Sequence, residues 1–169
     1  MDITGQYRIA APRHVVWAAL NDPEVLKRCI PGCKELEQKS PTDLAAKVGL
    51  KIGPISATFT GEVRLENLDP PAGYTIVGQG SGGAAGFAKG SAEVVLTEVE
   101  GGVETDLAYT AKADVGGKLA ALGGRLIQAT TKKLADEFFS AFAAELGPDN
   151  DEAASTGKKS RWAKWLGRG

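Results

Sequence analysis

The feature that most constrains this chain is an alternation of apolar and polar side chains that recurs from about residue 34 to residue 114. A period of two residues places successive side chains on opposite faces of a β-strand. Glycine- and proline-bearing turns interrupt it, for example Gly53-Pro54, residues 70–73 and Gly101-Gly102. The pattern predicts six consecutive strands joined by short connections, which favours an antiparallel sheet.

The segments on either side complete an α+β pattern. Residues 2–9 alternate in the same way and predict a seventh strand. Pro12 and Asp22-Pro23 each suit the start of a short helix. After residue 117 the apolar spacing changes to three and four, which predicts one long helix that ends before Gly147. We therefore expect a curved seven-stranded antiparallel sheet around a long C-terminal helix.

The apolar side of the predicted sheet carries unusually small residues, where a filled core would have Leu, Ile or Val. They are Gly5, Ala46, Ala57, Gly61, Gly78, Gly80, Ala111 and Ala113. Either the long helix fills this space and the glycines only let the sheet bend, or the space holds a ligand. We expect an apolar ligand cavity, in which Tyr109 is the best-placed polar group. Strand parity and the helix stripe predict its lining as Val48, Ile52, Phe59, Leu107, Tyr109, Leu122, Leu126 and Ile127.

A glycine-rich segment, residues 82–90, is predicted to be a mobile loop that carries one large apolar side chain, Phe87. Such a loop suits a gate over the cavity, so we include Phe87 among the ligand-binding candidates. The alternative is an ordinary loop with Phe87 packed into the core. The match of residues 78–83 to a G-x-G-x-x-G pattern is not a dinucleotide site, because a strand follows it instead of a helix.

The sequence does not indicate catalysis or metal binding. Cys29 and Cys33 have no second pair of ligands nearby, and His14 is the only histidine. The acidic side chains fall mainly on the polar side of the strands, away from the predicted cavity. We predict no catalytic residue, no metal and no covalently bound cofactor.

The charge of the chain is unevenly distributed. Residues 158–169 carry five basic residues and no acid, so residues 1–157 carry −6 although the whole chain carries only −1. Residues 147–157 are small, polar and non-periodic, which predicts a flexible linker. Basic residues beside tryptophan suit an anionic lipid surface. The expected membrane-docking residues are Lys158, Lys159, Arg161, Trp162, Lys164, Trp165 and Leu166.

A partner groove is an alternative target for this tail, whereas the acidic body argues against nucleic acid. The first residues lack the apolar core of a signal peptide, and no run of about 18 apolar residues is present. We expect a cytoplasmic protein that lies peripherally on the inner face of the cytoplasmic membrane.

Several uncommon sequence strings resemble those of the CoxG family, which is associated with carbon monoxide dehydrogenase. The resemblance covers residues 1–146. It rests on residues 22–26, 29–33, 53–55, 58–63, 82–90, 116–120 and 132–139. It implies a START-like, helix-grip fold of the polyketide-cyclase-like superfamily, with a ligand-binding domain at residues 1–146, the linker at 147–157 and the docking tail at 158–169.

The family resembles accessory proteins of aerobic carbon monoxide dehydrogenase and related molybdenum hydroxylases. The resemblance implies a non-catalytic protein that links such an enzyme to the membrane, with a respiratory quinone of the menaquinone type as its hydrophobic ligand. An assembly factor for the molybdenum enzyme remains an alternative, and a small cyclase or hydrolase is a weaker one.

Deleting residues 158–169 should abolish binding to anionic vesicles and leave the fold intact. Each basic residue near an anionic membrane contributes about 1 kcal/mol, and this contribution weakens as salt rises. Replacing Trp162 and Trp165 by Ala should weaken binding at every salt concentration, because the apolar contribution is not screened. Vesicle co-sedimentation measures both effects, and undiminished binding of the truncated chain would assign the tail to a protein partner.

Overall fold

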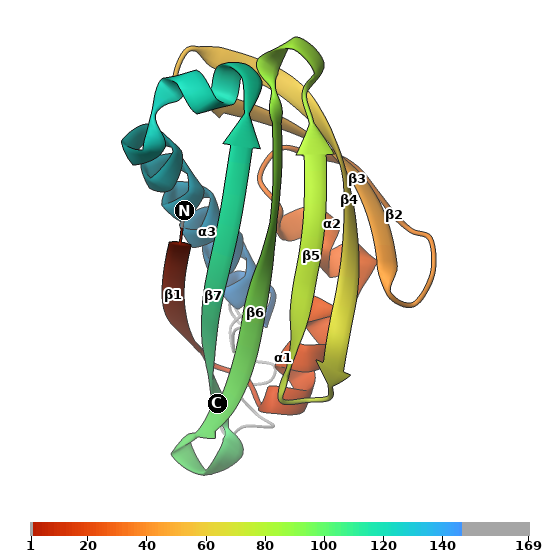
Figure 1. The fold of residues 1–169 in the computed structure, drawn as a ribbon. Helices are drawn as coiled ribbons and strands as arrows, with labels where there is room; N and C mark the ends of the chain where they lie inside the picture. The colour runs from red at the N-terminus through yellow and green to blue at the C-terminus, as the bar shows by residue number, and fades with distance from the viewer. Residues whose placement is uncertain (1, 147–169) are drawn as a thin grey trace.

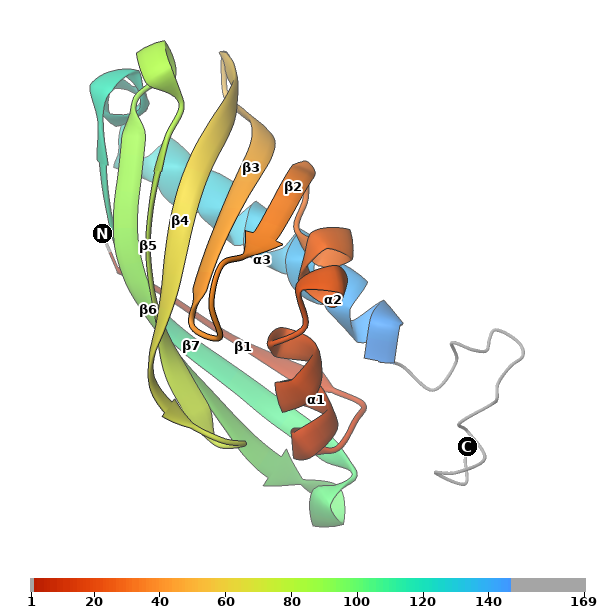
Figure 2. The same ribbon diagram turned by 90° about the vertical axis from the view of Figure 1, so that its right-hand side faces the viewer.

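The protein is described by a computed structural model that covers residues 2–146. Its strands form one antiparallel sheet, and the helices α1 to α3 lie on one side of it (Figures 1 and 2). In chain order the elements are β1 (Asp2–Ile9), α1 (Arg13–Leu20), α2 (Pro23–Cys29), β2 (Cys33–Gln38), β3 (Asp43–Ile52), β4 (Ile55–Asp69), β5 (Gly73–Ser81), η1 (Gly83–Ala85), β6 (Phe87–Val99), η2 (Glu100–Gly102), β7 (Glu104–Gly116), η3 (Gly117–Leu122) and α3 (Gly124–Leu146).

The sheet order is β1-β7-β6-β5-β4-β3-β2, so the first strand pairs with the last. Every other neighbouring pair is consecutive in the sequence. Figure 2 shows the sheet curving around α3, with α1 and α2 on the same concave side. The predicted α+β architecture of seven antiparallel strands and one long C-terminal helix is confirmed.

Local sequence signals account for the ends of the short helices. The Asp22 carboxylate accepts a hydrogen bond of 3.0 Å from the backbone N–H of Glu24, and Pro23 occupies the first turn of α2. This is the N-cap that the Asp-Pro pair predicted. The acidic Glu24 begins α2, and the basic Lys27 and Arg28 end it, which complements the helix dipole.

The long helix begins later than its apolar spacing predicted. Residues 117–122 form the 3₁₀ helix η3, and α3 starts only at Gly124. Gly123 separates the two with a φ of +90°, a conformation that ends a right-handed helix and that glycine adopts without a steric penalty. Leu119 and Leu122 therefore lie on η3 instead of on the long helix.

The buried side chains form two clusters, one toward each end of the sheet. The larger cluster surrounds Phe142 of α3 and Leu107 of β7, which are both 0% exposed. The smaller cluster joins Ile52, Phe59 and Leu119 to Ile127, near the start of α3. The long helix thus contributes buried side chains to the core at both of its ends.

Three contacts fix the C-terminal half of α3. The Phe139 ring stacks on the Tyr7 ring of β1 with a centroid distance of 4.3 Å. The Tyr7 hydroxyl donates a 2.5 Å hydrogen bond to Asp136. The Arg28 guanidinium of α2 makes a bidentate pair with Glu145, at 2.9 and 3.0 Å. The helix is therefore held toward β1 on one side and against α2 on the other.

Replacing Phe142 by Ala should lower the free energy of unfolding by about 3–5 kcal/mol, because it removes a fully buried ring and leaves a cavity. Phe87→Ala is the matched control, since Phe87 is 48% exposed. Its effect should stay below about 1 kcal/mol. Urea unfolding measures both variants, and equal losses would show that Phe142 does not anchor the helix.

Candidate functional site

An apolar cavity of about 430 Å³ lies between the concave face of β2–β5 and the three helices. This volume falls within the usual range for small-molecule sites. Leu20, Leu26 and Ile30 cover it from the α1–α2 region, and Phe138 and Phe139 from α3. The remaining lining residues are Asn21, Leu36, Gln38, Leu44, Ala46, Val48, Leu50, Phe59, Gly61, Val63, Leu65, Tyr74, Ile76, Val94 and Leu107.

Small residues on neighbouring strands explain why the sheet leaves this space. Ala46 of β3 pairs with Gly61 of β4, and Gly61 pairs with Gly80 of β5. A row of one alanine and two glycines therefore crosses three strands on the concave face. Larger side chains at these positions would fill the volume that the structure leaves open.

Small residues do not produce a hollow everywhere on this face. Gly5 of β1 pairs with Tyr109 of β7, and the Tyr109 ring covers it. A Cβ atom at Gly5 would lie only 2.4 Å from that ring. At this edge of the sheet the space beside a glycine is filled by protein, as the alternative interpretation of the small residues required.

The polar side chains of the lining belong to Asn21, Gln38 and Tyr74. Asn21 uses its amide N–H to donate a 2.9 Å hydrogen bond to the Trp17 carbonyl. Gln38 is exposed and lies at the rim. No histidine, carboxylate, lysine or arginine of the described residues 2–146 lines the cavity. The cavity therefore suits an uncharged, largely apolar molecule.

Tyr74 is the buried polar group of this lining. It is 6% exposed, and the Trp17 ring packs edge-on against its ring at a centroid distance of 5.3 Å. Burial raises the pKa of Tyr74, so the hydroxyl stays protonated and can donate a hydrogen bond. An unpaired buried hydroxyl costs about 1–3 kcal/mol, which a ligand acceptor would offset.

The nine predicted ligand-binding residues are not brought together in one place. Val48, Phe59 and Leu107 line the cavity. Ile52, Leu122 and Ile127 belong to the smaller core cluster. The remaining three, Leu126, Tyr109 and Phe87, also lie outside the lining.

Local packing explains where those three residues lie. The Leu126 side chain lies against Gly53, in the turn between β3 and β4. Tyr109 lies close to Tyr7 and Phe139, with ring centroids 6.3 and 6.2 Å away. Phe87 is exposed and its ring covers Gly116, where a Cβ atom would lie 2.3 Å from the ring.

The predicted glycine-rich loop is wrong in its extent. Strand β6 already begins at Phe87, so only residues 82–86 form the connection. Gly86 has a φ of +114°, and a Cβ atom there would lie 2.3 Å from the Gly116 carbonyl oxygen. The segment is thus a tight turn packed against the end of β7, and it cannot carry Phe87 over the cavity as a loop would.

The two cysteines are free thiols in poorly reactive settings. Cys29 is buried at the end of α2, and burial raises its pKa to about 11. Burial also raises the pKa of Cys33, whose thiol donates to the Glu35 carbonyl. A raised pKa keeps both side chains as thiols, and the thiolate is the reactive form.

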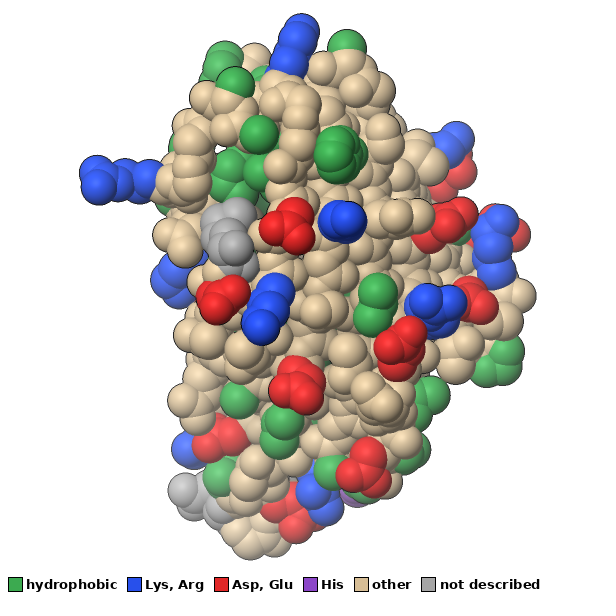
Figure 3. Space-filling model, in the orientation of Figure 1, with side chains coloured by type: hydrophobic (Ala, Val, Ile, Leu, Met, Phe, Trp, Pro, Cys, Tyr) green, Lys and Arg blue, Asp and Glu red, His purple; other side chains and the backbone are tan. Residues whose placement is uncertain are grey.

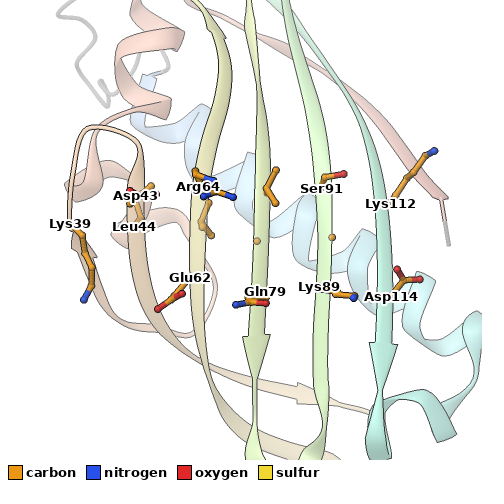
Figure 4. Close-up of a pocket in the computed structure, with 14 residues that line it drawn as sticks. Lys39, Asp43, Leu44, Glu62, Arg64, Gln79, Lys89, Ser91, Lys112 and Asp114 are labelled. Carbon is orange, nitrogen blue, oxygen red and sulfur yellow. The ribbon is translucent and has the colours of Figure 1, made fainter.

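A wider hollow of about 740 Å³ lies on the outer face of the sheet (Figure 4). Its walls mix the acids Glu62 and Asp114 with the bases Arg64, Lys89 and Lys112. Figure 3 shows acidic and basic side chains scattered over this face. A solvated surface of mixed charge does not suit an apolar ligand, so the inner cavity is the candidate functional site.

Sequence reasoning missed most of the lining. Tyr74 and Ile76 share the inward parity of β5 with Gly78, so an alternation count through Gly73 would have found them. Leu26, Ile30 and Phe138 could not be found in this way, because their placement depends on how α2 and α3 cross the sheet.

The predicted membrane-docking residues, from Lys158 to Leu166, lie outside the described residues. Within residues 2–146, the helices are too short or too polar to cross a bilayer.

Comparisons with known proteins agree with this fold. The carbon monoxide dehydrogenase family CoxG matches residues 5–147. A conserved protein from Geobacillus kaustophilus is 30% identical, with a TM-score of 0.82 over 88% of this chain and 97% of that chain. No curated protein matches the chain.

Two more distant structures share the fold. The Zhui aromatase/cyclase from Streptomyces sp. R1128 is 15% identical, with a TM-score of 0.67 over 92% of this chain and 99% of that chain. A START superfamily protein from Mycobacterium smegmatis is 14% identical, with a TM-score of 0.66 over 86% and 96% of the two chains. The architecture is therefore the START-like helix-grip fold.

Proposed function

Because the chain belongs to the CoxG family of carbon monoxide dehydrogenase, we propose that it is a non-catalytic accessory protein that binds a respiratory quinone of the menaquinone type. In this proposal it links aerobic carbon monoxide dehydrogenase, or a related molybdenum hydroxylase, to the inner face of the cytoplasmic membrane. The ligand would be held without a covalent bond.

The observation that carries the proposal is the apolar cavity between β2–β5 and the helices. Its volume of about 430 Å³ is enclosed by leucine, isoleucine, valine and phenylalanine side chains, with few polar groups. A space of this size and composition is favourable for an apolar molecule, because water gains few hydrogen bonds there.

A quinone matches the chemistry of this lining. It is uncharged, its ring and isoprenoid tail are apolar, and its carbonyl oxygens accept hydrogen bonds. A charged lipid fits less well, since no cationic or acidic side chain of the described chain lines the cavity.

The tail of residues 158–169 would bring the cavity to the bilayer. Its five basic residues and two tryptophans suit an anionic membrane surface. The linker of residues 147–157 would give a root-mean-square reach of about 17–20 Å. An apolar ligand could then pass between bilayer and cavity with little exposure to water.

A small cyclase is the alternative that the fold likeness to an aromatase/cyclase raises. General acid–base chemistry on a bound ligand needs a titratable group such as histidine or a carboxylate within hydrogen-bond reach. The described lining lacks both, which favours binding over catalysis. An assembly factor for the molybdenum enzyme, with an incidental cavity, is the second alternative.

Organic extraction of the purified full-length chain, followed by mass spectrometry, should yield about one quinone per chain. Ala46→Phe should remove most of it, because Ala46 lines the cavity on β3 and the new ring occupies the ligand volume. Ala45→Phe is the matched control, since neighbouring residues of a strand point to opposite faces.

The outcomes separate the alternatives. Loss of the quinone in Ala46→Phe alone supports the carrier function. A wild-type chain that yields no stoichiometric apolar molecule would contradict it and favour the assembly factor. Equal loss in both variants would show that the ligand does not occupy this cavity.

A further inference from the structure

Tyr74 differs from the other two tyrosines of the chain in how its hydroxyl is used. The Tyr7 hydroxyl donates to Asp136, and Tyr109 lies beside Tyr7, outside the cavity lining. Within residues 2–146, the Tyr74 hydroxyl has no hydrogen-bond partner. Tyr74 is therefore the phenol that both lines the cavity and is free to donate.

The surroundings of Tyr74 fix its position. The ring is 6% exposed, Trp17 packs edge-on against it, and its strand neighbour Val94 also lines the cavity. Asn21 is held by its hydrogen bond to the Trp17 carbonyl, so the amide oxygen of Asn21 remains available. Two fixed polar groups thus flank Trp17 in an otherwise apolar lining.

The exposed Gln38 marks the rim on the opposite side of the cavity. It lies on β2, whereas Tyr74 lies on β5, and β3 and β4 separate the two strands. At about 4.8 Å per strand, this separation is roughly 14 Å. A molecule that enters past Gln38 would have to pass beneath two strands before it reaches Tyr74.

The charges of the lining restrict the acceptor that Tyr74 can receive. A carboxylate or phosphate would be buried without a counter-ion, because no lysine or arginine of residues 2–146 lines the cavity. A carbonyl or ether oxygen carries no such cost and accepts the phenol proton directly.

We propose that Tyr74 recognises the head group of the ligand by donating a hydrogen bond to an uncharged oxygen, so the site selects neutral carbonyl-bearing apolar molecules over hydrocarbons and fatty-acid anions. This inference rests on the proposed apolar-ligand function and adds the residue and chemical class that give it selectivity. It also predicts that the head group lies at the Trp17 end of the cavity, with the tail toward Gln38.

The test uses the full-length chain, freed of co-purified lipid, and three probes with the same pentyl chain. The probes are 2-pentyl-1,4-naphthoquinone, 2-pentylnaphthalene and an analogue of the naphthalene whose chain ends in a carboxylate. Isothermal titration calorimetry gives the dissociation constant of each. The wild type should bind the quinone about tenfold more tightly than the hydrocarbon, and the anion more weakly than either.

Tyr74→Phe should weaken binding of the quinone about five- to tenfold and leave the hydrocarbon unchanged, because only the hydroxyl is removed. Tyr109→Phe is the matched control and should change neither constant, since Tyr109 does not line the cavity. Thermal unfolding of both variants confirms that the fold is retained.

Equal quinone affinity in the wild type and Tyr74→Phe would overturn the inference and leave the proposed function standing. The same would follow if Tyr74→Phe weakened the quinone and the hydrocarbon by the same factor, because that result indicates altered packing. A wild-type chain that binds none of the probes would contradict the proposed function as well.

Discussion

The stacking of Phe139 on Tyr7 is the contact on which the rest of this structure depends. It places the C-terminal half of α3 beside β1, and the hydrogen bond from Tyr7 to Asp136 fixes the helix in that position. The helix therefore lies toward the β1 side of the concave face. The part of that face formed by β3 to β5 is left to be covered by α1, α2 and the phenylalanine edge of α3, which leaves the cavity.

The sheet contributes to the same result through its small residues. Ala46, Gly61 and Gly80 form a cross-strand row on the concave face, so the uncovered part of the sheet is also its thinnest part. At the opposite edge the same kind of gap, at Gly5, is occupied by the Tyr109 ring. The fold thus fills the space beside β1 with aromatic protein side chains and leaves the space beneath β3 to β5 for a ligand.

Much of this architecture could be predicted from the sequence, because strand parity and turn residues act locally. The strands, the Asp22 cap and the long C-terminal helix all follow from spacing and local chemistry. The choice between Tyr109 and Tyr74 could not be predicted, although both point inward. It depends on the register of β1 with β7, which places Gly5 opposite Tyr109, and on the crossing of α1, which brings Trp17 to Tyr74. Phe87 was misplaced for a similar reason, since β6 extends further than its glycines suggested.

The central claim is that a neutral, carbonyl-bearing apolar ligand occupies the space between β3–β5 and α3. A crystal of the full-length chain soaked with a brominated naphthoquinone, and measured at the bromine absorption edge, tests it most directly. We expect one anomalous peak inside the cavity, between Tyr74 and Phe59. A peak only on the charged outer face, or no ordered bromine at a concentration that saturates binding in solution, would contradict the account.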